Sequence, residues 1–262
     1  PQVLILYRIS DLGCHKNNTR LENATKEHCL LNAAEIFGKE NFYIIADNCS
    51  DELIKFIQDN NFKFERTSLG NSKSFKYALT KAIKEYDDEQ IIYFLEDDFL
   101  HLPGSRNLII EGLEIADYVT LYDHGDQYVK YNWKYEGSAP FNRFGFHRWK
   151  IFLTDHSHWR EAPSTTMTFA AKIKTLKQDY KIWMQNPDEG TPKDFLSFLK
   201  ITKQKNIIDF FKILRMKKTA LAILLNNFAW FRKKRLLISA LPGKSTHTEK
   251  KWLSPLTDWT KV

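Results

Sequence analysis

The chain is poor in cysteine and contains no long uninterrupted hydrophobic run. Its three cysteines, Cys14, Cys29 and Cys49, are too few for a disulfide framework, and none forms a CxxC pair that would hold zinc. The longest apolar stretch, residues 220–231, contains two asparagines and is shorter than the roughly 20 residues that cross a bilayer. The sequence therefore predicts a cytoplasmic protein without a transmembrane helix.

Glycine is also scarce, with ten residues among 262, which excludes collagen-like repeats and glycine-rich low complexity. Hydrophobic residues make up 43% of the chain and aromatic residues 14%, a composition typical of a folded protein. A chain of this length suffices for one α/β domain with a sizeable core, or for one such domain with a helical appendage.

Positive charge is concentrated in one segment. Residues 200–235 hold eleven Lys and Arg and a single acid, Asp209, so they carry +10, and the rest of the chain sums to 7 − 10 = −3. Nucleic acid, an anionic membrane surface or a solvated helix face would each account for such a segment. Its apolar residues recur at helical spacing, which predicts one or two basic amphipathic helices.

Strand and helix patterns alternate through the first hundred residues. Apolar runs predict strands over residues 3–9, 42–46, 62–66 and 91–95, and helical spacing predicts helices over 19–37, 51–58 and 75–86. This alternation is typical of a doubly wound parallel sheet, in which ligands lie beyond the carboxyl ends of the strands. Acids follow three of the predicted strands: Asp11, Asp47, and Glu96 to Asp98.

The second half is less regular. We expect a helix over 108–116, a strand over 118–122, a strand that includes Ser164 to Thr168, and helices over 170–180 and 192–199. Between them, residues 123–148 form a loop-rich stretch full of Tyr, Trp, Phe and Asn, and the tail from Ala240 is rich in Pro, Ser, Thr and Trp.

The cluster Glu96-Asp97-Asp98 directly follows the most apolar predicted strand. Three adjacent carboxylates raise one another's pKa unless a cation neutralises them. All-oxygen ligation suits Mg²⁺ or Mn²⁺, which also take oxygens from substrate phosphates. The alternative is a solvated loop that follows a strand.

These residues carry a resemblance to a known family. The string Tyr93 to Asp98 resembles the acidic metal motif of GT-A glycosyltransferases, and Asp11 and Asp47 occupy positions where that family reads the nucleobase. The segment 69–79 is similar to the Asn-x-Gly-x-x-x-Ala-x-Asn segment of the family-two group, although the order of Gly and Asn is altered and the last Asn is missing. Residues 193–199 resemble the segment that carries the catalytic base, with Lys193 in place of its usual Glu.

The resemblance implies a GT-A fold, a Rossmann-like, mostly parallel sheet flanked by helices, followed by the basic helical segment. It implies that Asp98 binds Mn²⁺ or Mg²⁺, with His247 of the tail completing the site, and that Glu96 and Asp97 hold a ribose hydroxyl or a metal-bound water. Lys73 and Arg8 would reach the donor phosphates. Asp194 would act as general base in an inverting reaction, with Asp188 and Glu189 in reserve.

For four of these residues a plainer interpretation stays open. Lys73 and Arg8 would otherwise be surface charges. His247 would otherwise be an ordinary surface histidine, and Asp194 a helix N-terminal acid stabilised by the helix dipole.

The expected reaction is transfer of a sugar from a UDP- or GDP-sugar to a hydroxyl of a glycan or lipid-linked acceptor. The acceptor would stack on the aromatic walls Trp133, Tyr135, Trp149 and Trp159. Residues 1–199 would form the catalytic domain, with a donor half to about residue 100 and an acceptor half beyond it. Residues 200–262 would form the basic segment, attached to the inner face of a membrane, and a tail that packs back on the active site.

Two other functions remain as alternatives. A sugar-phosphate nucleotidyltransferase shares a nucleotide-binding sheet and metal-binding acids, but residues 10–18 after the first strand contain a single glycine where a glycine-rich phosphate loop would favour it. A nucleic-acid-binding module would use the basic segment and leave the acidic cluster unexplained, so a nucleic-acid partner is not expected.

Overall fold

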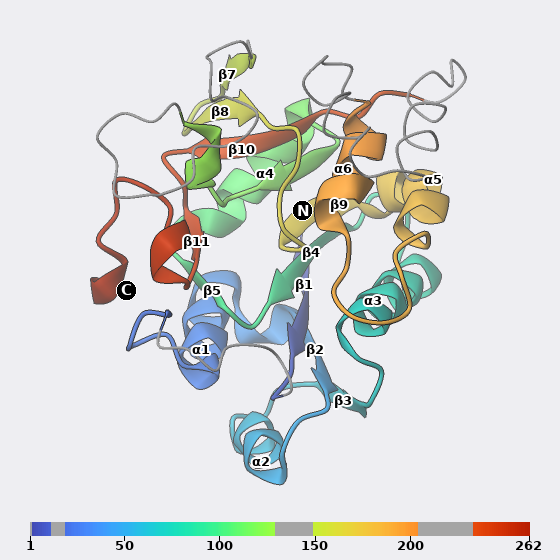
Figure 1. Cartoon of the computed structure of the whole chain (residues 1–262), viewed down its shortest axis with the longest axis vertical. Coiled ribbons are helices and arrows are strands. Elements are labelled where there is room, and N and C mark those ends of the chain that lie inside the picture. Colours follow the sequence, from blue (N-terminus) through green and yellow to red (C-terminus); the bar gives the residue numbers. More distant parts are fainter. Residues whose placement is uncertain (1, 12–18, 129–148, 204–232) are drawn as a thin grey trace.

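The computed structural model describes residues 2–11, 19–128, 149–203 and 233–262. In this part of the chain, one large sheet lies between two layers of helices (Figure 1). The first half alternates strand and helix as β1 (Val3–Ile9), α1 (Lys26–Phe37), β2 (Phe42–Asp47), α2 (Asp51–Asp59), β3 (Phe64–Thr67), α3 (Asn71–Glu85) and β4 (Ile91–Glu96).

The second half adds shorter strands and three helices among the described residues. Its elements are β5 (Phe99–His101), α4 (Ser105–Ile115), β6 (Tyr118–Thr120), β7 (Ile151–Leu153), β8 (His158–Glu161), β9 (Phe169–Lys172), α5 (Ile173–Trp183), α6 (Asp194–Thr202), β10 (Leu237–Leu241) and β11 (Ser245–His247).

The described strands of the large sheet follow the order β3-β2-β1-β4-β9-β6-β10-β8-β7, and β11 pairs with β5 in a small second sheet. Strands β1 to β4 are mutually parallel, β9 runs antiparallel between β4 and β6, and β10 is parallel to β6. The carboxyl ends of β1, β2, β4, β6 and β10 therefore lie along one edge of the sheet. The predicted mostly parallel α/β sheet flanked by helices is confirmed.

Two hydrophobic cores cover the two faces of the sheet. One joins it to α1, α2 and α4, and the other joins it to α3, α5 and α6, which lie together on one side in Figure 1. In the second core the ring of Trp183 stacks on Phe169 at 5.0 Å and 11°. Burial of these continuous apolar strands on both faces is what holds the carboxyl edge in place.

Several predicted boundaries are wrong. The helix expected over 19–37 begins only at Lys26, because the Thr25 hydroxyl caps it by accepting from the amide of His28. The residues before it run beside the chain's last segment, where Arg20 forms a β-bridge with Glu249. The tail from Ala240, for which the sequence predicts no strand, contains the end of β10 and all of β11.

The strand expected at Ser164 to Thr168 is also wrong, since the strand is β9, beginning at Phe169. The hydroxyls of this segment accept hydrogen bonds from backbone amides. Thr166 accepts from the nearby amide of Thr168, and Thr168 accepts from the amide of Glu96 at the end of β4. The following helix shifts accordingly to Ile173–Trp183.

Residues 204–232, which hold most of the basic segment, lie outside the described residues. Its two ends meet, because the amide of Arg235 donates to the carbonyl of Ile201 at 3.1 Å. Among the described residues, no helix is long and apolar enough to cross a membrane.

Candidate functional site

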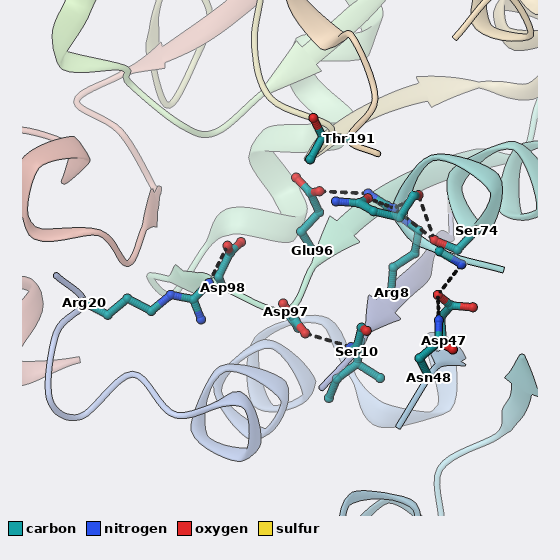
Figure 2. A pocket seen from close by; sticks show the side chains of 13 residues that line it. Arg8, Ser10, Arg20, Asp47, Asn48, Ser74, Glu96, Asp97, Asp98 and Thr191 are labelled. Carbon is teal, nitrogen blue, oxygen red and sulfur yellow. Dashed lines mark hydrogen bonds and ion pairs between the residues drawn. The ribbon is translucent and has the colours of Figure 1, made fainter. Parts of the chain in front are cut away.

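A cavity of about 320 Å³ opens at the carboxyl ends of β1, β2 and β4 (Figure 2). The ends of β1 and β2 and the start of α3 form one side, and the acidic cluster forms the other. Its lining residues are Arg8, Ile9, Ser10, Arg20, Asp47, Asn48, Gly70, Asn71, Ser74, Glu96, Asp97, Asp98 and Thr191. The structure thus brings five of the predicted site residues, Arg8, Asp47 and the three cluster acids, to one cavity.

Arg8 and Glu96 face each other across the floor of this cavity. They are register partners on β1 and β4, and the guanidinium of Arg8 donates to Glu96 Oε1 at 2.8 Å. The same guanidinium donates to the Asn71 carbonyl and side chain and to the Ser74 hydroxyl, so four bonds fix it in place. Burial raises the pKa of Glu96 to about 7, against the lowering effect of Arg8.

Asp97 binds the residue that follows β1. Its Oδ2 accepts from the backbone amide of Ser10 at 2.9 Å and from the ammonium group of Lys26, the first residue of α1. Lys26 also donates to the Ser10 carbonyl. The Asp97 carboxylate therefore fastens the loop after β1 to α1.

Asp98 lies in the turn between β4 and β5, and its Oδ2 has two partners. Arg20 donates to it at 3.0 Å, and His247 Nε2 lies 3.1 Å away. Its other oxygen, Oδ1, is buried and has no hydrogen-bond partner among the described residues. Burial opposes ionisation of Asp98, but the charges of His247 and Arg20 hold its pKa well below the usual range.

The last strand places His247 against the acidic cluster. In the β11–β5 pair His247 is the register partner of Phe99, and the Thr248 amide donates to the Asp98 carbonyl at 2.9 Å. Upstream, a close approach requires glycine: a Cβ at Gly243 would lie 2.7 Å from Ser254 Oγ and 2.9 Å from Asp123 Cβ. The chain after β10 can therefore cross the carboxyl edge of the sheet.

Asp98 and His247 fit a divalent cation as a pair of ligands. The unpartnered Oδ1 is the kind of buried atom that a cation satisfies, and a separation of 3.1 Å between Oδ2 and Nε2 matches adjacent ligands of an octahedral ion with bonds of about 2.1 Å. Among the described residues, no group of three or more His, Cys, Asp and Glu surrounds a common point. Waters and phosphate oxygens would complete such a shell, as is usual for Mg²⁺.

The tautomer of His247 bears on this fit. The Glu249 amide donates to Nδ1 at 3.1 Å, so the hydrogen of the neutral ring lies on Nε2 and points to Asp98. Ligation through Nε2 requires that hydrogen to move to Nδ1, which breaks the contact with Glu249.

Asp47 is buried and its carboxylate is fully used. Oδ1 accepts from the Thr67 hydroxyl and the Leu69 amide, and Oδ2 accepts from the Gly70 amide and the Asn48 side chain. Four bonds fill the lone-pair sites of a carboxylate. Asp47 therefore holds the turn between β3 and α3, and nucleobase binding through it, which stays a prediction, requires one of these bonds to be given up.

Asp11 and Lys73 lie at the margin. Asp11 is exposed and accepts from the Ser50 amide at the start of α2, at 2.6 Å. Lys73 is exposed on the first turn of α3 and does not line the cavity, whereas its neighbours Asn71 and Ser74 do. Sequence analysis missed Arg20 as a site residue, because nothing distinguishes an arginine before a helix from a surface charge.

Asp194 begins α6 and is largely buried. Its Oδ1 accepts from the Phe195 amide at 2.6 Å, and burial raises its pKa. The loop before it contacts α3, where the Ser72 amide donates to the Gly190 carbonyl at 3.2 Å, and Thr191 of this loop lines the cavity. The charge of Asp194 contributes, after burial and the charge of Asp98, to the raised pKa of Glu96.

The outcome differs among the aromatic residues predicted to line the acceptor site. Trp159 is wrong as a wall, since it is 0% exposed and belongs to the core, with its indole donating to Thr154. Trp133 and Tyr135 lie outside the described residues. Two aromatic residues flank His124 instead: the Tyr122 and Trp252 rings each lie 5.0 Å from the His124 ring. The charge of His124 lowers the pKa of Asp194, against the larger effect of burial.

No protein-family model matches the chain, and no curated protein matches it in sequence. Solved structures do. GalNAc-T7 with UDP, GalNAc and Mn²⁺ has a TM-score of 0.53 at 9% identity over 96% of this chain and 45% of that one. TarS 1-349 of S. aureus gives 0.44 at 16% identity, covering 76% and 54% of the two chains.

CMP-2-keto-3-deoxy-manno-octonic acid synthetase complexed with CTP gives a TM-score of 0.47 at 10% identity over 93% and 92% of the two chains. The chain spans about half the length of the TarS and GalNAc-T7 chains it matches. At these identities the likeness shows the fold alone. The protein has a GT-A-like fold, as the resemblance in its sequence implied.

Proposed function

We propose that this protein is a metal-dependent glycosyltransferase that moves a sugar from a nucleoside-diphosphate sugar to a hydroxyl group. One observation carries the proposal: a buried carboxylate with an unpartnered oxygen, Asp98, lies beside His247 at the edge of a cavity that Arg8 and Arg20 also line. A cation bound to Asp98 and His247 would, together with the side chains of Arg8 and Arg20, neutralise the charge of a diphosphate.

The fold supports the donor class. The GalNAc-T7 structure, which shares this fold, contains UDP, GalNAc and Mn²⁺. We extend that combination to this chain as a UDP- or GDP-sugar donor with Mn²⁺ or Mg²⁺. The cavity is lined by acids, amides and hydroxyls that can bind a ribose and a base.

Each residue has a part in the proposed reaction. Asp98 and His247 would hold the cation, which supplies Lewis-acid stabilisation of the leaving diphosphate. Glu96 and Asp97 would bind a ribose hydroxyl or an ordered water. Asp47 would contact the nucleotide from the wall of the cavity, and Asp11 and Lys73 would contact it from the margin. Asp194, whose pKa is raised by burial, would take the proton from the acceptor hydroxyl.

The acceptor belongs to the proposal as well. A glycan or lipid-linked acceptor would approach Asp194 past the rings of His124 and Trp252. The basic segment, whose ends meet at Ile201 and Arg235, would attach the protein to the anionic inner face of a membrane and bring it to such an acceptor.

The proposal is tested by thermal denaturation with UDP, GDP, CDP, ADP and CTP, each with and without Mn²⁺. A ligand that binds the folded protein raises its melting temperature, and at a given concentration the rise is larger for a tighter ligand. We expect UDP or GDP to raise it only with Mn²⁺. A shift with CTP and no shift with any diphosphate would favour the nucleotidyltransferase, and no shift with any nucleotide would refute both.

A further inference from the structure

Arg20 differs from Arg8 and from the nearby Lys26 in how loosely its side chain is held. Arg8 makes four hydrogen bonds, and Lys26 binds both Asp97 and a backbone carbonyl. The guanidinium of Arg20 has one hydrogen-bonded partner among the described residues, Asp98 Oδ2, and its buried Nε has none (Figure 2).

The main chain beneath Arg20 is fixed. Arg20 forms a β-bridge with Glu249, and the amide of its neighbour Leu21 donates to the Thr248 carbonyl at 3.0 Å. A change in the Arg20 side chain therefore needs no movement of the backbone. The side chain already lines the cavity, so a ligand bound there lies within its reach.

We propose that Arg20 is an exchangeable counter-cation of the donor site, which pairs with Asp98 until a divalent cation takes that carboxylate and then binds the donor diphosphate. The inference rests on the proposed function. A divalent cation at Asp98 repels a guanidinium 3.0 Å from the same carboxylate oxygen. A diphosphate offers the displaced guanidinium two acceptor oxygens in the fork geometry that arginine prefers.

The exchange would couple the binding of the cation to the binding of the nucleotide. Arg20 competes with the cation when the cation binds alone, and it assists when cation and nucleotide bind together. The two ligands therefore bind cooperatively, and each strengthens the other by the same factor. Loss of Arg20 should change the two affinities in opposite directions, whereas loss of a merely structural contact would weaken both.

The test measures Mn²⁺ binding alone by electron paramagnetic resonance, and UDP and GDP binding at saturating Mn²⁺ by calorimetry, for Arg20→Gln and Arg20→Lys. Lys26→Gln is the matched control, since it removes the same charge from the neighbouring Asp97. We expect Arg20→Gln to bind Mn²⁺ about 5- to 100-fold more tightly and the nucleotide more weakly by a similar factor, in the usual range of coupling energies.

Arg20→Lys should fall between Arg20→Gln and the wild type, because lysine keeps the charge but not the fork. Lys26→Gln should change Mn²⁺ affinity less than Arg20→Gln does. Equal or weaker Mn²⁺ binding by Arg20→Gln, in a protein whose wild type binds nucleotide with Mn²⁺, would overturn this inference alone. Absence of Mn²⁺-dependent nucleotide binding in the wild type would overturn the proposed function, and the inference with it.

Discussion

His247 Nε2 lies 3.1 Å from Asp98 Oδ2, although the two residues belong to the last described strand and to the turn after β4. The contact depends on the β11–β5 pair, which fixes His247 opposite Phe99. Burial opposes the charged form of His247, but the charge of Asp98 raises its pKa. The tail of the chain is thereby part of the candidate site.

Replacement of Asp194 by Asn should separate binding from turnover. The variant keeps the shape of the side chain and its contact with the Phe195 amide, but it cannot accept a proton, so turnover should fall by about 10²-fold or more with little change in donor affinity. Steady-state kinetics and calorimetry measure the two effects. Asp59→Asn is the control, since Asp59 is 61% exposed and paired with Lys55. Unchanged turnover in Asp194→Asn would move the role to Asp188 or Glu189.

Asp47 should matter for stability more than any exposed acid. In Asp47→Ala the partly buried amides of Leu69 and Gly70 lose their acceptor, which should lower the free energy of unfolding by about 2–4 kcal/mol. The control Asp59→Ala removes an exposed pair with Lys55 and should cost less than about 1 kcal/mol. Urea denaturation at pH 7 compares them, and an equal cost in both variants would mean that Asp47 does not hold the turn.

His101 should make the protein sensitive to mild acid. It is fully buried, its Nε2 lies 2.9 Å from the Tyr93 hydroxyl, and burial lowers its pKa to about 3. The unfolded state, with a histidine pKa near 6.5, binds the proton first, so stability falls as the pH drops below about 6.5. Between pH 7 and 4.5 the wild type should lose about 2 kcal/mol more than His101→Gln, whatever the variant's stability at pH 7.

Urea denaturation of both proteins at the two pH values measures this difference. The other titratable groups contribute equally in the two proteins, so their contributions cancel in this difference. Equal losses of stability in the wild type and His101→Gln would show that His101 accepts a proton without leaving the core.

The basic segment should bind anionic vesicles. Each Lys or Arg near an anionic surface contributes about 1 kcal/mol, so Lys217→Glu with Lys218→Glu should weaken co-sedimentation with such vesicles by at least about tenfold. Lys233 and Lys234 are unsuitable targets, because they pair with Asp117 and Glu161. Lys63→Glu with Lys84→Glu, two exposed residues, gives the same change in net charge, and no binding of the wild type at low salt would eliminate attachment.

Much of the structure of the first half of the chain could be predicted from local sequence patterns. The strands at Val3–Ile9 and Ile91–Glu96 are continuous apolar runs, and Ser50 caps α2 as its position before two acids indicates. Because parallel strands end at one edge, the sequence also placed Asp47 and the acidic cluster together.

The remainder depends on contacts between distant segments. Phe99–His101 and Ser245–His247 are each three residues long, and they form strands only because they pair with each other. Two of the four bonds that fill Asp47 come from the turn before α3, and Arg20, which is bridged to Glu249, pairs with Asp98. No periodicity in the sequence encodes such contacts.

The most direct measurement is release of nucleoside diphosphate from UDP- and GDP-sugars, with water or simple glycans as acceptor, for the wild type and Asp98→Ala. A direct ligand should cost at least the roughly 100-fold that a supporting residue can cost. The account predicts release that requires Mn²⁺ or Mg²⁺, stops on chelation and falls at least about 100-fold in Asp98→Ala. Metal-independent release that survives in Asp98→Ala, or release of pyrophosphate from CTP in place of any diphosphate, would contradict it.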